Sequence, residues 1–144
     1  MSAESFSPID IHHFLHLQNV AVSTYRCHLS KALASFNASI VWLAQSLADI
    51  PPGNMINRLS VRMLTYADAG HGASWDISYF SSVMKDTDWE QLDATLSRPQ
   101  LRAFRGITFR FCIALHDVYV DLTALVRARL PKTRKLNKLY FENQ

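Results

Sequence analysis

Apolar residues recur at helical spacing over the first third of the chain. Between Leu15 and Leu43 an apolar residue returns every seven positions, which is typical of one face of a helix. Pro8 suits the first turn of such a helix, and nothing interrupts the pattern before Pro51. The spacing therefore predicts one long helix over residues 8–49. The residues of its apolar seam are Leu15, Val22, Leu29, Phe36 and Leu43.

A second long helix is predicted over residues 99–130. Its apolar residues alternate steps of three and four from Leu101 to Leu125. Pro99 suits the first turn of this helix, and Pro131 ends it. Because apolar residues also lie off this seam, the helix is expected at the centre of a bundle.

Two or three short helices are expected between the two long ones. Asn54 can cap the first and Ser74 the second, while Thr87 and Glu90 form a capping box for the third. We find no period-two alternation typical of strands. The sequence therefore predicts an all-α helical bundle with two long helices, first and last.

Length and composition fit a single folded domain. The chain has 144 residues, of which 49% are hydrophobic and 19% charged, so it can bury a core. We expect a flexible N-terminus over residues 1–7, one helical-bundle domain over 8–131 and a basic C-terminal tail over 132–144. No signal-peptide pattern and no apolar stretch of about 18 residues is present, so a cytoplasmic protein with no membrane span is expected.

Neither the cysteines nor the histidines predict a metal site. Cys27 and Cys112 are far apart in the sequence and form no C-x-x-C spacing. His12 and His16 lie four positions apart, but the heptad pattern places them on the outer face and no third ligand is spaced to complete a site. We expect no metal and no cofactor.

Polar residues of the last predicted helix are the candidate catalytic residues. Arg110, Asp117 and Asp121 are spaced by seven and four, so they would share one helical face. The expected structural role is a network in which Arg110 pairs with Asp117, or a simple solvated edge of the helix. In an enzyme, His116 would transfer a proton, Arg110 would stabilise anionic charge and an aspartate would orient the imidazole.

The segment Arg110-Phe-Cys-Ile-Ala-Leu-His116, followed by Asp117 and Tyr119, resembles the Arg-x(4–6)-His signature of HEPN-type ribonucleases. The resemblance covers this segment alone. It implies an all-helical protein that dimerises so that two such motifs face one RNA cleft. It departs from the family at Phe111, where a polar side chain is common. A metal-independent ribonuclease using Arg110 and His116 is therefore an alternative function.

The C-terminal end of the chain is basic. Six basic residues and no acid lie within twelve positions. Such a cluster can bind nucleic acid or an anionic membrane surface, or it can form a solvated tail. The basic residues are Arg127, Arg129, Lys132, Arg134, Lys135 and Lys138.

These patterns favour a binding protein over an enzyme. Between residues 11 and 48 only Arg26 and Lys31 are charged, so the first helix is expected to pack against a second copy through its seam. We expect a non-enzymatic homodimer that binds another macromolecule, in the first place a protein, as an accessory, inhibitor or regulatory factor. The ribonuclease and a nucleic-acid-binding protein acting through the basic segment are the two alternatives.

Overall fold

The computed structural model shows an α/β protein. It describes residues 18–24, 29–48, 50, 53–65, 78, 81–82, 84, 86–99, 101–113 and 116–143. The strands are β1 (Asn19–Ser23), β2 (Arg58–Leu64), β3 (Gly106–Cys112) and β4 (Leu139–Asn143). The helices are α1 (Leu29–Leu47), α3 (Asp86–Leu96), α4 (His116–Arg129) and α5 (Pro131–Lys135).

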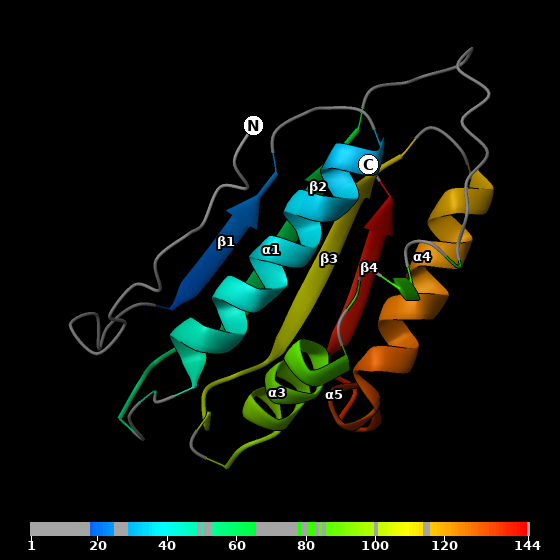
Figure 1. Cartoon of the computed structure of the whole chain (residues 1–144). Helices are drawn as coiled ribbons and strands as arrows, with labels where there is room; N and C mark the ends of the chain where they lie inside the picture. Colours follow the sequence, from blue (N-terminus) through cyan, green and yellow to red (C-terminus); the bar gives the residue numbers. More distant parts are fainter. Residues whose placement is uncertain are drawn as a thin grey trace.

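The four strands form one parallel sheet in the order β1-β2-β3-β4, which is also their order in the sequence. Parallel neighbours need crossover connections, and these are almost always right-handed. Because the strand order never reverses, right-handed crossovers place every helix on the same side of the sheet. Figure 1 shows α1 in front of the central strands, α4 beside β4, and α3 and α5 at the end where the strands begin.

Ring contacts confirm that α1 and α3 pack on the same face. Phe109 and Phe111 of β3 are buried, and Phe36 of α1 meets both rings edge-on at centroid distances of 5.9 and 5.7 Å. Trp89 of α3 stacks on Phe109 at 6.3 Å. The hydrophobic core therefore lies between this face of the sheet and the helices.

Helix α4 packs on this face as well. Tyr119 of α4 meets Phe111 at a centroid distance of 6.1 Å, and the Arg127 guanidinium lies 5.2 Å from the centroid of the Phe141 ring in β4. Phe141 in turn stacks on Phe109 at 5.7 Å. We call this side of the sheet the helix face. No described helix packs on the opposite side, which we call the open face.

The prediction of an all-α bundle is wrong. Residues 58–64 and 106–112, for which the sequence predicts helix, form β2 and β3. Leu59 and Met63 are four residues apart, a spacing that keeps them on one face of a helix and also on one face of a strand. Val61 distinguishes the two, because in a helix it would lie opposite Leu59, whereas here all three are buried together. Of the predicted helix over 99–130, only α4 is a long helix.

The first helix is also shorter than predicted. It begins at Leu29, and residues 19–23 instead form β1, which pairs with β2. The 19 residues of α1 correspond to about 29 Å at roughly 1.5 Å per residue, somewhat more than the about 23 Å of the seven-residue strand β2 at roughly 3.3 Å per residue. The predicted segment before residue 18 lies outside the described residues.

Two further predictions concern the short elements. The helix expected from Thr87 and Glu90 is present as α3, whereas most of the one expected from Ser74 lies outside the described residues. The segment expected to form a basic tail contains most of α5 and all of β4. No helix in the described part of the chain is long and apolar enough to cross a membrane.

Candidate binding surface

The open face is polar, because strand residues alternate between the two sides of the sheet. Register neighbours on this face form rows, such as Ser60, Thr108 and Tyr140, or Arg62, Arg110 and Glu142. Most of these side chains are exposed or half-buried. The open face consists of Asn19, Ala21 and Ser23 of β1, Arg58, Ser60, Arg62 and Leu64 of β2, Gly106, Thr108, Arg110 and Cys112 of β3, and Tyr140 and Glu142 of β4.

Three arginines stand on the two central strands of the open face. Arg58 is the first residue of β2, Arg62 lies further along the same strand, and both side chains are exposed. Arg110 on β3 is the register neighbour of Arg62. Neighbouring strands are about 4.8 Å apart, so these two cations repel each other unless an anion lies near them. No ion pair joins Arg58 or Arg62 to another residue in the described part of the chain. Among the described residues, Arg58 and Arg62 therefore bring positive charge to this face without an acidic partner.

Glu142 is the acidic residue that the described strands place on this face. Its Oε2 atom lies 3.1 Å from Nε of Arg110, and the two side chains are 52% and 43% exposed. An ion pair this exposed is weak and readily exchanged for another partner. Arg110 can therefore pair with an incoming anion at small cost.

Tyr140 of β4 lies over β3 on the open face. A Cβ atom placed on Gly106 would come within 2.5 Å of Cε2 and 2.9 Å of Cδ2 of the Tyr140 ring. The missing side chain of Gly106 is thus what allows the ring to lie there. The Tyr140 hydroxyl donates a hydrogen bond to the carbonyl of Asn137 at 3.1 Å, yet the residue stays 51% exposed. An aromatic ring is therefore available beside the arginines.

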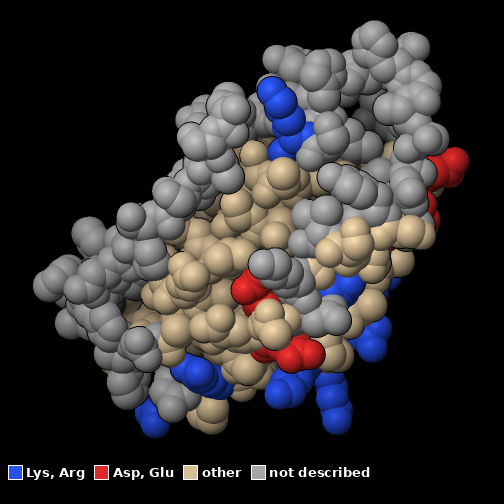
Figure 2. All heavy atoms as spheres, in the orientation of Figure 1, with Lys and Arg blue, Asp and Glu red and all other residues tan. Residues whose placement is uncertain are grey.

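A second group of cations, which we call the basic edge, lies where the strands begin. Three of its members are on α5 and three in the connection from α3 to β3, and all six are exposed. Figure 2 shows Lys and Arg side chains projecting from this end, while most of the described surface over α1 is uncharged. The basic edge consists of Arg98, Arg102, Arg105, Lys132, Arg134 and Lys135.

Asp93 lies next to the basic edge and is engaged by backbone amides of α5. It is buried near the end of α3, and its carboxylate accepts hydrogen bonds from the backbone amides of Lys132 and Thr133 at 3.0 and 2.8 Å. These amides belong to the first turn of α5, and amides in the first turn of a helix have no acceptor within the helix. The acid therefore serves to hold α5 in place.

The structure does not bring the four candidate catalytic residues together. Arg110 projects from β3 toward the open face and pairs with Glu142, not with Asp117. His116, Asp117 and Asp121 belong to α4, which packs on the helix face. The helix that the HEPN resemblance implies for this segment is absent, because Arg110 lies in a strand.

The residues proposed for self-association have other positions. Phe36 and Leu43 are buried in the protein's own core, and Val22 of β1 packs against that core. Leu29 is the first residue of α1, and Leu15 lies outside the described residues. Phe36 and Leu43 are therefore not available for a seam between two copies.

The basic residues predicted near the C-terminus are divided among several environments. Lys132, Arg134 and Lys135 join the basic edge. Arg127 lies over Phe141, whereas Arg129 donates hydrogen bonds to the carbonyls of Met84 and Ser81 and to the Ser81 hydroxyl at 3.0, 3.3 and 3.1 Å. The ammonium of Lys138 lies 5.6 Å from the ring centroid of Phe104. Arg129 thus has a structural role.

Candidate metal ligands give no site in the described part of the chain. No three His, Cys, Asp or Glu residues gather there closely enough to hold an ion. Cys112 is a free cysteine on the open face, and Cys27, His12 and His16 lie outside the described residues.

Three comparisons with known proteins gave no relative. No protein-family model matches the chain, and no curated protein and no solved structure is significantly similar to it. What the described residues define is the fold, a parallel sheet in sequential order with the described helices on one face.

Sequence reasoning missed the open face because it missed the strands. Arg58, Arg62, Tyr140 and Glu142 did not figure among the candidate site residues. A signal was present, since Leu-Ser-Val-Arg-Met in β2 and Ile-Thr-Phe-Arg-Phe in β3 match position by position in residue type. Both segments alternate apolar and polar residues, as strands with one solvated face do.

Proposed function

We propose that this protein is a non-catalytic binding protein that recognises another macromolecule through the open face of its sheet. The observation that carries the proposal is that the helices lie on one face, while the other face exposes Arg58 and Arg62 in mid-sheet. Parallel sheets usually have both faces covered. Where repeated strand–helix units leave one sheet face bare, as in horseshoe-shaped solenoids, such extended surfaces serve binding.

The topology argues against a small-molecule site of the usual α/β kind. In doubly wound sheets, ligands bind in the crevice where the strand order reverses, because the flanking helices switch sides there. The order β1-β2-β3-β4 has no reversal. Arg110 lies in β3 and pairs with Glu142, whereas His116, Asp117 and Asp121 lie in α4, an arrangement that gives the catalytic hypothesis no support. Both points favour binding over catalysis.

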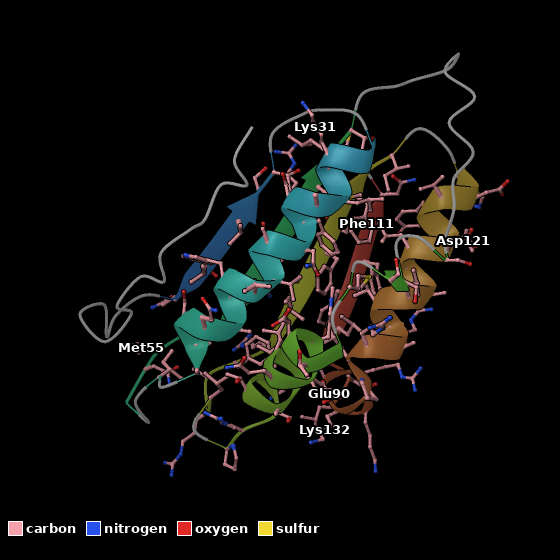
Figure 3. The ribbon with its side chains drawn as sticks, in the orientation of Figure 1. Lys31, Met55, Glu90, Phe111, Asp121 and Lys132 are labelled. Carbon is pink, nitrogen blue, oxygen red and sulfur yellow. The ribbon has the colours of Figure 1, made fainter. Side chains whose placement is uncertain are left out.

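Charge reversal on each side of the molecule tests the proposal. Wild-type protein, Arg62→Glu and Lys31→Glu are immobilised and exposed to the same cell extract, and the retained macromolecules are quantified. Lys31 is an exposed residue of α1, on the helix side (Figure 3). The Lys31→Glu control therefore makes the same charge change as Arg62→Glu, but outside the open face. Retention should fall several-fold for Arg62→Glu and persist for Lys31→Glu. Equal retention by wild type and Arg62→Glu contradicts the proposal.

A further inference from the structure

We infer that the open face binds single-stranded nucleic acid, an inference that rests on the proposed function and names its partner class. The inference depends on one feature of the open face: the exposed ring of Tyr140 shares this face with arginines from two neighbouring strands. Single-stranded nucleic acid offers both matching chemistries, a phosphate backbone and unstacked bases whose π-faces are accessible. The sheet gathers on one surface groups that are far apart in the sequence.

The aromatic component is the Tyr140 ring over Gly106. Thr108 is the register neighbour of Tyr140, and Gly106 under the ring is the register neighbour of Arg58 on β2, so polar side chains of two strands lie on this part of the face. A base stacked on the ring would bring its sugar-phosphate backbone within the range of these neighbours. Stacking of this kind tolerates any base, so binding should depend little on sequence.

The electrostatic component extends beyond a single phosphate. Arg58 and Arg62 are four residues apart on β2, which corresponds to about 13 Å at roughly 3.3 Å per residue. The basic edge continues the positive charge past the end at which the strands begin. An extended polyanion can therefore contact Arg62 and Arg110, pass Tyr140 and Arg58, and leave over the basic edge. A mononucleotide could not use all of these groups.

Two other anionic partners fit the surface less well. A duplex keeps its bases stacked and is read by elements that enter its grooves, so it gains nothing from the Tyr140 ring. An acidic peptide can pair its carboxylates with Arg58 and Arg62, but it does not require an aromatic platform. The ring therefore favours single-stranded nucleic acid among the polyanions.

Fluorescence anisotropy with a labelled single-stranded oligouridylate of about 16 nucleotides, the upper site size of small single-strand-binding folds, tests the inference. Affinity is measured between about 50 and 200 mM salt for wild type, Arg62→Gln, Lys31→Gln and Tyr140→Leu. Loss of one phosphate contact in Arg62→Gln should reduce the slope of log affinity against log salt by about 0.7. Lys31→Gln removes an equal charge from the other side and should leave the slope unchanged.

Tyr140→Leu separates stacking from electrostatics. Affinity should fall about 5- to 150-fold, as for loss of one stacked base, while the salt slope stays that of the wild type. The residue is exposed, so the variant should keep its fold, which circular dichroism verifies.

Three results would overturn the inference. The first is equal weakening by Arg62→Gln and Lys31→Gln, which indicates unspecific charge attraction. The second is equal affinity for a duplex of the same length. The third is absence of oligonucleotide binding at the lowest salt. If a polyglutamate peptide then binds in an Arg62-dependent manner, the proposed function stands and only the partner class is wrong. If neither probe binds, the inference is rejected and the extract experiment decides the proposed function separately.

Discussion

Asp93 near the end of α3 and Thr133 in the first turn of α5 are joined by two hydrogen bonds. The carboxylate Oδ1 accepts one from the Thr133 amide at 2.8 Å and one from its hydroxyl at 2.7 Å. Both residues are buried, and Oδ2 accepts a third bond from the Lys132 amide. This cap, which is supplied by another helix, holds α5 against the body of the protein and so positions β4, which carries Tyr140.

Asp93→Ala should lower the free energy of unfolding by about 3 kcal/mol, because it leaves buried donors of α5 without an acceptor. Glu90→Ala, an exposed substitution on the same helix, should change it by less than about 0.5 kcal/mol. Urea unfolding followed by circular dichroism measures both values. Similar losses for the two variants would contradict the role assigned to Asp93.

Gly106→Ala should destabilise the protein by about 1 to 3 kcal/mol, because the added methyl group overlaps the Tyr140 ring and crowds the carbonyl of Lys138. In a Tyr140→Ala background the ring is gone, so the same substitution should cost much less. The double-mutant cycle measures the difference as a coupling energy. An equal cost in both backgrounds would show that the ring does not lie over Gly106.

Phe36→Ala should lower the free energy of unfolding by about 3 to 5 kcal/mol, because Phe36 packs against Trp89, Phe109 and Phe111. Gln45→Ala, an exposed change on the same helix, is the control. If Phe36 belongs to the protein's own core, its loss should cost the same at low and high protein concentration. A cost that rises with concentration would instead indicate the intermolecular seam expected from the sequence.

Glu142→Gln should strengthen oligonucleotide binding, because it removes the acid that pairs with Arg110 on the open face. Affinity should rise by up to about 5-fold, because Arg110 no longer gives up a carboxylate partner when it contacts a phosphate, while the slope of log affinity against log salt stays that of the wild type. Stability should change by less than about 1 kcal/mol, since the ion pair is exposed. Asp117→Asn makes the same charge change at an exposed acid of α4, outside the open face, and should leave the affinity unaltered. Equal affinities for both variants would contradict this assignment.

The sequence predicted the elements whose apolar spacing fits a helix and does not also fit a strand. The capping box at Thr87 and Glu90 predicted α3, and the apolar spacing from Leu33 to Leu47 is that of α1. The prediction failed where the apolar spacing fits both a helix and a strand. Ile107 and Phe111 share a face in a helix as well as in a strand, so their spacing alone does not distinguish the two. Phe109, which is buried between them, does.

The open face could not be predicted without the topology. Arg62, Arg110 and Tyr140 come from three strands separated by long connections, and only the parallel register places them on one face. The alternation in β2 and β3 indicates one solvated face, but neither the strand order nor the side taken by the helices follows from it. The HEPN resemblance rested on a helix spacing that the sheet does not provide.

Site-specific photo-crosslinking tests the central claim most directly. A benzophenone amino acid replaces Thr108, at the centre of the open face, or Ala34, an exposed residue on the helix side. Both proteins are irradiated in the same cell extract after circular dichroism has shown them to be folded. If the open face is the binding surface, position 108 should give discrete adducts that position 34 does not give. Adducts at position 34 with none at position 108 would contradict the account.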